Sequence, residues 1–138
     1  AESQRDSTLI LMGKKVLAPV LTDGHGRSLQ DPAWAWYDSK NVRTGLWQIP
    51  EPIAPILPAS AIDQVEVVLC SALFVDRSGY RVGVGGGWYD RVLAHRADDV
   101  PVWAVVNDDE ILDEVPHDPW DESVTAALTP SGLHMLGQ

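Results

Sequence analysis

The sequence predicts an α/β domain, and three features of the 138-residue chain support this fold class. Three apolar runs, at residues 15–21, 65–70 and 100–106, have the length of buried strands. Apolar residues at positions 9, 10 and 12, followed by Gly13, are typical of a helix that ends just before the first run. A glycine-rich loop after the second run leads into a segment of helical character. This alternation predicts an α/β fold whose ligands bind at the carboxyl edge of the sheet.

The glycine-rich loop is the most informative segment of the chain. Glycine occupies four of the five positions in residues 83–87, so the backbone there is free to approach a ligand closely. Trp88, Val92 and Leu93 then follow with helical spacing, which predicts a helix that begins near Gly87. A glycine loop that leads into a helix presents unpaired N–H groups, an arrangement typical of anion-binding sites.

The remaining elements have weaker patterns. We expect an aromatic strand around residues 34–37 bracketed by turns at residues 31–32 and 38–41, an extended proline-rich connection over residues 49–58, a short helical turn at residues 58–63, and a final strand within residues 126–136. The length of the chain predicts a single domain.

The distribution of charge restricts the partners. The net charge is −10, and all ten Lys and Arg lie in residues 1–97, whereas residues 98–122 hold ten acids and no base. Such a chain is not expected to bind a nucleic-acid backbone. Residues 74–96, however, carry four Arg against two Asp, so the glycine loop is locally basic. This favours a small polyanion such as a nucleotide, accompanied by a divalent cation.

Several site classes are excluded by their missing patterns. No apolar run approaches the roughly 20 residues of a membrane span, so we expect a soluble, cytoplasmic protein without a membrane partner. The single cysteine, Cys70, lies in an apolar run and is expected to be a core residue. The histidines lack zinc-site spacing, and the glycine loop matches neither the Walker nor the dinucleotide-binding pattern.

Three candidate residues near the loop and its helix keep alternative interpretations. Asp90 either stabilises the helix N-terminus or holds Mg²⁺ against phosphate oxygens. Tyr89 faces either the core or a ligand. His117, which precedes Asp118 between two prolines, is either part of an acid/base or ligand pair or part of a surface loop.

The run LFVDRSGYRVGVGGGWYDRVL, at residues 73–93, resembles the signature of 5-formyltetrahydrofolate cyclo-ligases, also called methenyltetrahydrofolate synthetases. In that family an Asp-Arg-x-Gly turn leads into Arg-Leu-Gly-x-Gly-x-Gly-Tyr-Tyr-Asp and a helix. A looser likeness extends from about Leu9 to the C-terminus and includes residues 14–19, 45–52 and 116–129.

The resemblance implies a fold and an activity. The fold is a three-layer α/β arrangement of the ribose-phosphate isomerase and CoA-transferase type, with an open, mostly parallel sheet and flanking helices. The activity is the ATP- and Mg²⁺-dependent conversion of 5-formyltetrahydrofolate, a reduced formyl folate, to 5,10-methenyltetrahydrofolate by a monomeric enzyme. The alternative is a degenerate homologue that binds nucleotide or folate as a regulatory module without turnover.

The resemblance also implies the roles of individual residues. Catalytic roles fall to Arg81 and Tyr89. The residues expected to bind ATP are Arg81, Gly83, Val84, Gly85, Gly86, Gly87, Trp88 and Tyr89. Asp90 and Asp121 are expected to hold Mg²⁺, and Gln48, Glu51 and Trp88 to contact the folate.

This sequence departs from the family pattern at several points. The first helix and first strand of the family have no counterpart, which implies a chain shortened at its N-terminus. Trp88 replaces the first Tyr of Tyr-Tyr-Asp. Gln48 stands at a family Glu position, unless Glu51 is the true match. The family His-Asp pair corresponds to Trp120-Asp121 in an ungapped alignment and to His117-Asp118 in a gapped one.

Overall fold

The computed structural model describes residues 15–22, 27–38, 40, 42–44, 50–52, 54–83, 88–97, 99–119 and 121–137. The chain divides into two compact units, Ala1–Ala61 and Ile62–Gln138, and each is described here by itself. The expected single domain stays a prediction. The expected helix before residue 13 lies outside the described residues.

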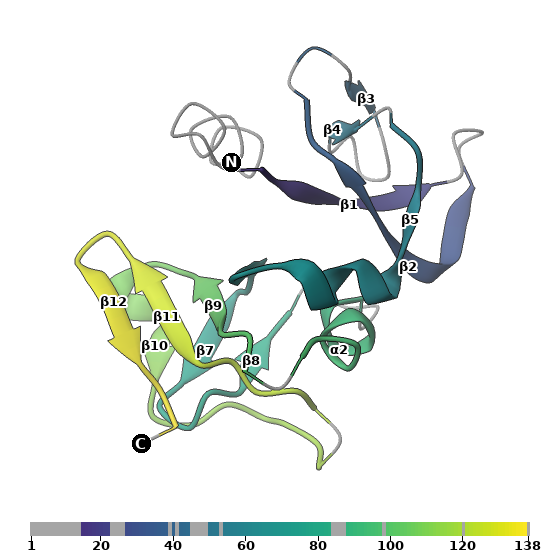
Figure 1. The fold of residues 1–138 in the computed structure, drawn as a ribbon. Helices are drawn as coiled ribbons and strands as arrows, with labels where there is room; N and C mark the ends of the chain where they lie inside the picture. Colours follow the sequence, from purple (N-terminus) through teal and green to yellow (C-terminus); the bar gives the residue numbers. More distant parts are fainter. Residues whose placement is uncertain are drawn as a thin grey trace. The chain divides into compact units, whose positions relative to one another are not determined.

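The first unit is built from antiparallel strands (Figure 1). Strands β1 (Leu17–Thr22), β2 (Ser28–Trp36) and β5 (Leu57–Pro58) form a sheet in the order β1-β2-β5. Strands β3 (Val42–Thr44) and β4 (Pro50–Pro52) form a separate two-stranded sheet. The proline-rich connection is thus extended as expected, and β5 lies at a sheet edge, where a missing N–H group is tolerated.

The core of the first unit lies on one face of β1 and β2. Val20, Ala33 and Ala35 are buried together, with Leu29 and Ala54 packed against them. The expected turn at residues 31–32 is wrong, because both residues lie inside β2. The register between β1 and β2 shifts here, since Val20 pairs with Ala33 and the next pairing is Thr22 with Ser28. Such an irregularity accommodates a proline that the regular ladder would reject.

The second unit contains the sheet that positions the site. Its strand order is β12-β11-β9-β6, formed by β6 (Val68–Ser71), β9 (Val102–Val105), β11 (Ala126–Thr129) and β12 (Gly132–Met135). β6, β9 and β11 run parallel, so their carboxyl ends lie at one edge. β12 pairs antiparallel with β11 in a hairpin, drawn in yellow in Figure 1. The predicted core residue Cys70 is buried in β6.

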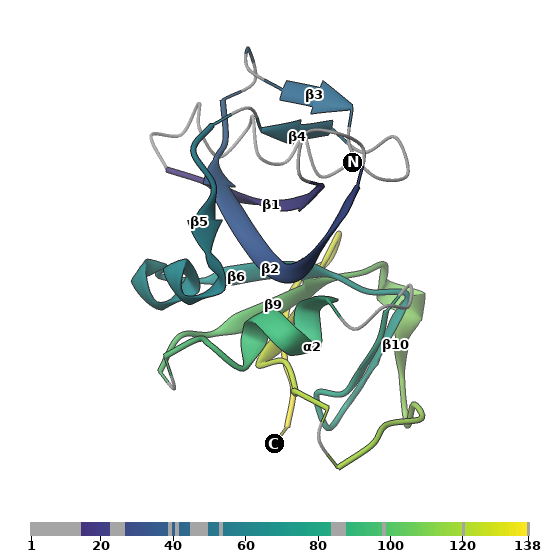
Figure 2. The ribbon, with the colours of Figure 1, turned by 90° about the vertical axis from the view of Figure 1, so that its right-hand side faces the viewer.

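A smaller sheet and three short helices complete the described elements. β10 (Ile111–Leu112), β7 (Phe74–Asp76) and β8 (Arg81–Val82) form a sheet in the order β10-β7-β8, with β7 and β10 parallel. The helices are η2 (Ala59–Gln64), α2 (Trp88–Leu93) and η3 (Asp108–Glu110); α2 and β10 are visible in Figure 2. The predicted helix after the glycine loop is confirmed, and it buries Val92 and Leu93.

The mixed α/β class is confirmed, but the mostly parallel sheet is wrong for the described strands, because antiparallel pairings outnumber parallel ones. The connections of β7 to β8 and of β11 to β12 are too short for a parallel crossover, so these strands pair antiparallel. The expected single strand within residues 126–136 is a hairpin that turns before Gly132, whose φ is 129°. Among the described helices, none is long and apolar enough to cross a membrane.

Candidate functional site

A turn organised by Asp76 leads into the site. The Asp76 carboxylate is buried, and its Oδ1 accepts hydrogen bonds from the backbone N–H groups of Ser78 and Tyr80, each at 3.0 Å. Its Oδ2 accepts a third bond, at 3.1 Å, from the N–H of Val115. A buried carboxylate is tolerated where such bonds compensate its lost hydration. Asp76 therefore fixes the start of β8 and ties it to the segment after β10.

Gly79 completes this turn and is fixed by two constraints. Its φ is 97°, a conformation that L side chains rarely adopt. A Cβ added at Gly79 would also lie 2.5 Å from the carbonyl oxygen of Val124. The backbone makes a hydrogen bond at the same place, from the N–H of Val124 to the carbonyl of Gly79 at 2.7 Å. The turn thus packs directly against the segment that enters β11.

Arg81 joins β8 to the first turn of α2. Its side chain is only 6% exposed, and its guanidinium carbon lies 5.1 Å from the centre of the Tyr89 ring. Its Nη2 lies 3.8 Å from Oδ1 of Asp90, a long ion pair. The Nε atom is buried and has no hydrogen-bond partner among the residues that the structure describes. A Cβ on Gly83 would lie 2.7 Å from Nη1 of Arg81, so the glycine makes room for the guanidinium.

The structure thus brings four of the predicted site residues together: Arg81, Gly83, Tyr89 and Asp90. Trp88 joins them through an edge-to-face contact with Tyr89, with ring centres 5.0 Å apart. Trp88, Tyr89 and Asp90 are all half-buried. The roles predicted for these residues stay predictions.

Other predicted site residues lie elsewhere or outside the described chain. Val84, Gly85, Gly86, Gly87, Gln48 and Trp120 are outside the described residues. Glu51 lies in β4, where it pairs in register with Arg43. Asp121 accepts a hydrogen bond at 2.8 Å from the N–H of Asp118 through its Oδ2, so its described contact closes its own turn. Within the described chain, no group of three or more His, Cys, Asp and Glu residues is arranged to hold a metal ion.

His117 is exposed and lies against an aromatic ring. It stacks on Tyr80 with ring centres 3.5 Å apart and planes 4° apart. Its Nδ1 lies 3.2 Å from the carbonyl oxygen of Val115. These contacts fit the interpretation of His117 as part of a surface loop that packs on the turn at residues 76–80.

The carboxyl edge of the parallel strands carries a second cluster of polar residues. A depression of about 390 Å³ lies there, lined by Val105, Val106, Asn107, Glu110, Leu128, Thr129 and Pro130. Ligands of open α/β sheets bind outside this edge. Glu110 Oε1 accepts a 2.6 Å hydrogen bond from the N–H of Asn107, which holds η3 beside the depression.

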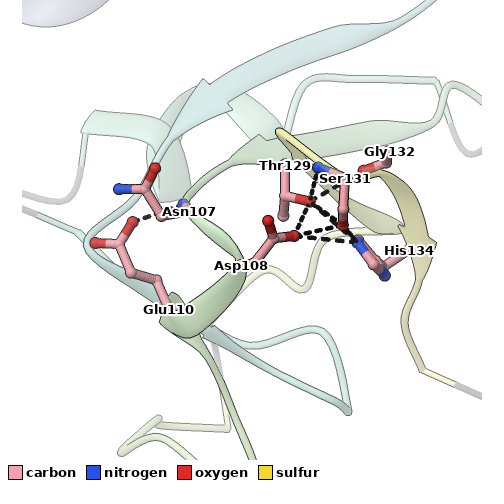
Figure 3. A network of polar contacts seen from close by, with 7 residues as sticks. All are labelled: Asn107, Asp108, Glu110, Thr129, Ser131, Gly132 and His134. Atoms are coloured by element: carbon pink, nitrogen blue, oxygen red, sulfur yellow. Dashed lines mark hydrogen bonds and ion pairs between the residues drawn. The ribbon is translucent and has the colours of Figure 1, made fainter.

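Asp108 links η3 to the β11–β12 turn (Figure 3). The hydroxyl groups of Thr129 and Ser131 both donate to Asp108 Oδ1 at 2.5 Å. Nε2 of His134 lies 3.0 Å and 2.9 Å from these two hydroxyl oxygens. Because each hydroxyl has a single proton and donates it to Asp108, the His134 Nε2 must itself carry a proton and donate.

This network lowers the pKa of Asp108. The hydrogen bond from Ser131 is the largest cause, followed by that from Thr129, with His134 adding a favourable charge interaction at 3.6 Å. Sequence reasoning missed the network. Its signals were a polar run directly after β9 and the Thr-Pro-Ser sequence directly after β11, at the edge where ligand-binding residues collect.

Comparison with known proteins identifies the family. The family described as "5-formyltetrahydrofolate cyclo-ligase family" matches residues 3–130. The chain belongs to the 5-formyltetrahydrofolate cyclo-ligase family. It is 42% identical over 123 residues to the 5-formyltetrahydrofolate cyclo-ligase of Mycolicibacterium smegmatis, with 89% of this chain and 63% of that protein covered. It is 30% identical over 123 residues to the enzyme of the same name from Escherichia coli K12, with 86% and 65% covered. The chain thus spans just under two thirds of the length of these relatives.

Solved structures of cyclo-ligase relatives share the fold. The NMR structure of 5,10-methenyltetrahydrofolate synthetase from Aquifex aeolicus superimposes with a TM-score of 0.75 at 19% identity, covering 100% of this chain and 66% of that one. The synthetase from Mycoplasma pneumoniae gives a TM-score of 0.57 at 16% identity, covering 88% and 59%.

Proposed function

We propose that the protein converts 5-formyltetrahydrofolate to 5,10-methenyltetrahydrofolate in an ATP- and Mg²⁺-dependent reaction of folate one-carbon metabolism. The observation that carries this proposal is the family match over residues 3–130, which includes the whole glycine loop and its helix. A cytoplasmic, monomeric enzyme without nucleic-acid or membrane partners is part of the proposal. So is the three-layer arrangement of the ribose-phosphate isomerase and CoA-transferase type.

The described residues fit MgATP. Mg²⁺ is usually bound by one or two carboxylates together with phosphate oxygens. Asp90 offers a carboxylate that is 36% exposed and has only a long ion pair with Arg81. Bound there, Mg²⁺ would neutralise negative charge on the phosphates. The partly unsatisfied guanidinium of Arg81 adds positive charge at the same place.

Positioning and charge are what the proposed reaction requires from the protein. The formyl oxygen attacks the γ-phosphorus of ATP and ADP leaves; the second folate nitrogen then closes on the formyl carbon, and phosphate departs with the formyl oxygen. Backbone groups of residues 83–88 would hold the triphosphate, and Tyr89 would lie beside the formyl group. Asp121 would supply a second carboxylate, and Gln48, Glu51 and Trp88 would contact the folate. Little covalent chemistry by a side chain is needed.

Asp90→Asn tests the metal part of this proposal. The neutral amide is a weaker ligand for Mg²⁺, so we expect the rate of methenyltetrahydrofolate formation at limiting Mg²⁺ to fall at least about tenfold. The rate is measured from the absorbance of the product with MgATP, with ATP alone and without nucleotide. Asp99→Asn, which alters an exposed acid just after the same helix, is the matched control and should leave the rate unchanged. Equal rates for both variants, or turnover without ATP, would contradict the proposal.

A further inference from the structure

We infer that Arg81 acts as a positioning residue, which holds the Tyr89 ring and the Asp90 carboxylate in place for MgATP and does not itself contact the phosphates. This inference rests on the proposed function. It concerns how one buried cation contributes to the site.

Burial is the first observation. Only 6% of the Arg81 side chain is exposed, and its Nε atom is buried. A direct phosphate ligand presents its N–H groups to the ligand, usually in a bidentate fork. The Arg81 guanidinium instead lies between the Tyr89 ring, 5.1 Å from its centre, and Gly83, whose Cα has no room for a Cβ beside Nη1. Its accessible surface is therefore too small for a bidentate contact.

The direction of its contacts is the second observation. Both neighbours with opposite or complementary charge belong to the first turn of α2: the Tyr89 ring face and the Asp90 carboxylate. A planar guanidinium suits both, because it packs flat on an aromatic ring while its edge faces a carboxylate. Arg81 thus connects β8 to the two residues of α2 that the proposed reaction uses.

The exposure of Asp90 completes the argument. Its carboxylate is 36% exposed, so it can contact a ligand while its other side faces Arg81. A residue that orients a metal-binding carboxylate typically contributes a factor of about 10 to 100 to metal affinity. Loss of Arg81 should therefore weaken the Mg²⁺-dependent part of ATP binding, and leave the remainder unchanged.

Binding measurements separate the two roles. Titrations of ATP in EDTA and in excess Mg²⁺ are compared for the unaltered protein, Arg81→Gln, Asp90→Asn and the double variant. We expect Arg81→Gln to bind ATP in EDTA within about twofold of the unaltered protein and to lose about tenfold or more in Mg²⁺. The double variant should be no weaker than Asp90→Asn, because the two residues act as one unit. Arg91→Gln, at an exposed position of the same helix, is the control and should bind normally.

Other results overturn the inference. A loss of about tenfold in EDTA for Arg81→Gln, or additive losses in the double variant, would mean that Arg81 contacts the phosphates directly. Arg81→Lys guards against a folding defect: it keeps the charge but loses the planar fork, and it should lose Mg²⁺-dependent binding as Arg81→Gln does. Full binding by Arg81→Lys would show that charge alone suffices. Failure of the proposed function looks different, because the unaltered protein would then neither bind ATP nor form product, and the inference falls with it.

Discussion

Gly79 and Gly132 separate two reasons for a glycine at the scale of single residues. Both have positive φ, 97° and 129°, but only a Cβ at Gly79 would collide with backbone. We expect Gly132→Ala to lower the free energy of unfolding by about 1–3 kcal/mol through backbone strain alone. Gly79→Ala should cost about 1–3 kcal/mol more, because the Val124 carbonyl must move. Urea denaturation of both variants measures the difference, and equal losses would mean that the contact with Val124 is unimportant.

Asp108 gives a pH-dependent prediction. Because its pKa in the folded protein is lower than in the unfolded chain, its ionised form stabilises the fold at pH values above about 4, and this contribution is lost as the pH falls through the folded pKa. Ser131→Ala removes the largest cause of the lowering, so the pKa of Asp108 should rise toward its ordinary value. NMR titration of the carboxyl carbon measures this rise.

Ser123→Ala is the control for this titration, since Ser123 is an exposed serine outside the network. It should leave the Asp108 titration unchanged. If Ser131→Ala also leaves it unchanged, the hydroxyl of Ser131 does not determine the pKa of Asp108.

Residue roles could be predicted from the sequence only where neighbours in the chain define them. The order of residues 81–90 indicated a cluster near the glycine loop, and Arg81, Gly83, Tyr89 and Asp90 do meet there. The network of Asp108 joins residues more than 20 positions apart, and the partners of Asp76 include Val115. Such contacts depend on strand order and register, which one sequence does not specify.

At the scale of elements, α2 is too short to be stable by itself and depends on its buried face. An isolated helix of six residues is far below the length at which helices form in water. Leu93, 1% exposed, provides part of that buried face. We expect Leu93→Ala to lower the free energy of unfolding by about 2–5 kcal/mol, measured by urea denaturation.

Leu133→Ala is the matched control, because Leu133 is 43% exposed on the edge strand β12. It should cost about 1 kcal/mol or less. A Leu93→Ala loss of similar size would mean that α2 is not held by core packing.

The elements that were predicted correctly are those with apolar runs of strand length. Residues 15–21, 65–70 and 100–106 indicated β1, β6 and β9 to within a few residues. The β11–β12 hairpin was expected as one strand, because its turn at Pro130 and Ser131 interrupts the apolar pattern for only two residues. The turn expected at residues 31–32 lies in β2 because a register shift accommodates Pro32, and local preference could not show this.

At the scale of the whole molecule, the family could be predicted from one segment, and the antiparallel pairing could not. The long motif at residues 73–93 carries specific information about the family. The parallel arrangement of β6, β9 and β11 matches the α/β expectation, whereas the first unit is antiparallel throughout its described strands. Alternation of apolar runs predicts the class of fold but not the direction in which strands pair.

The central claim is that this protein transfers the formyl oxygen of its folate substrate to phosphate. The most direct measurement uses 5-formyltetrahydrofolate labelled with ¹⁸O in the formyl group, incubated with the protein and MgATP, and mass spectrometry of the inorganic phosphate released. The proposed reaction predicts one ¹⁸O atom in each phosphate, with one phosphate formed per methenyltetrahydrofolate. Methenyltetrahydrofolate that forms together with unlabelled phosphate, or without phosphate, would contradict it.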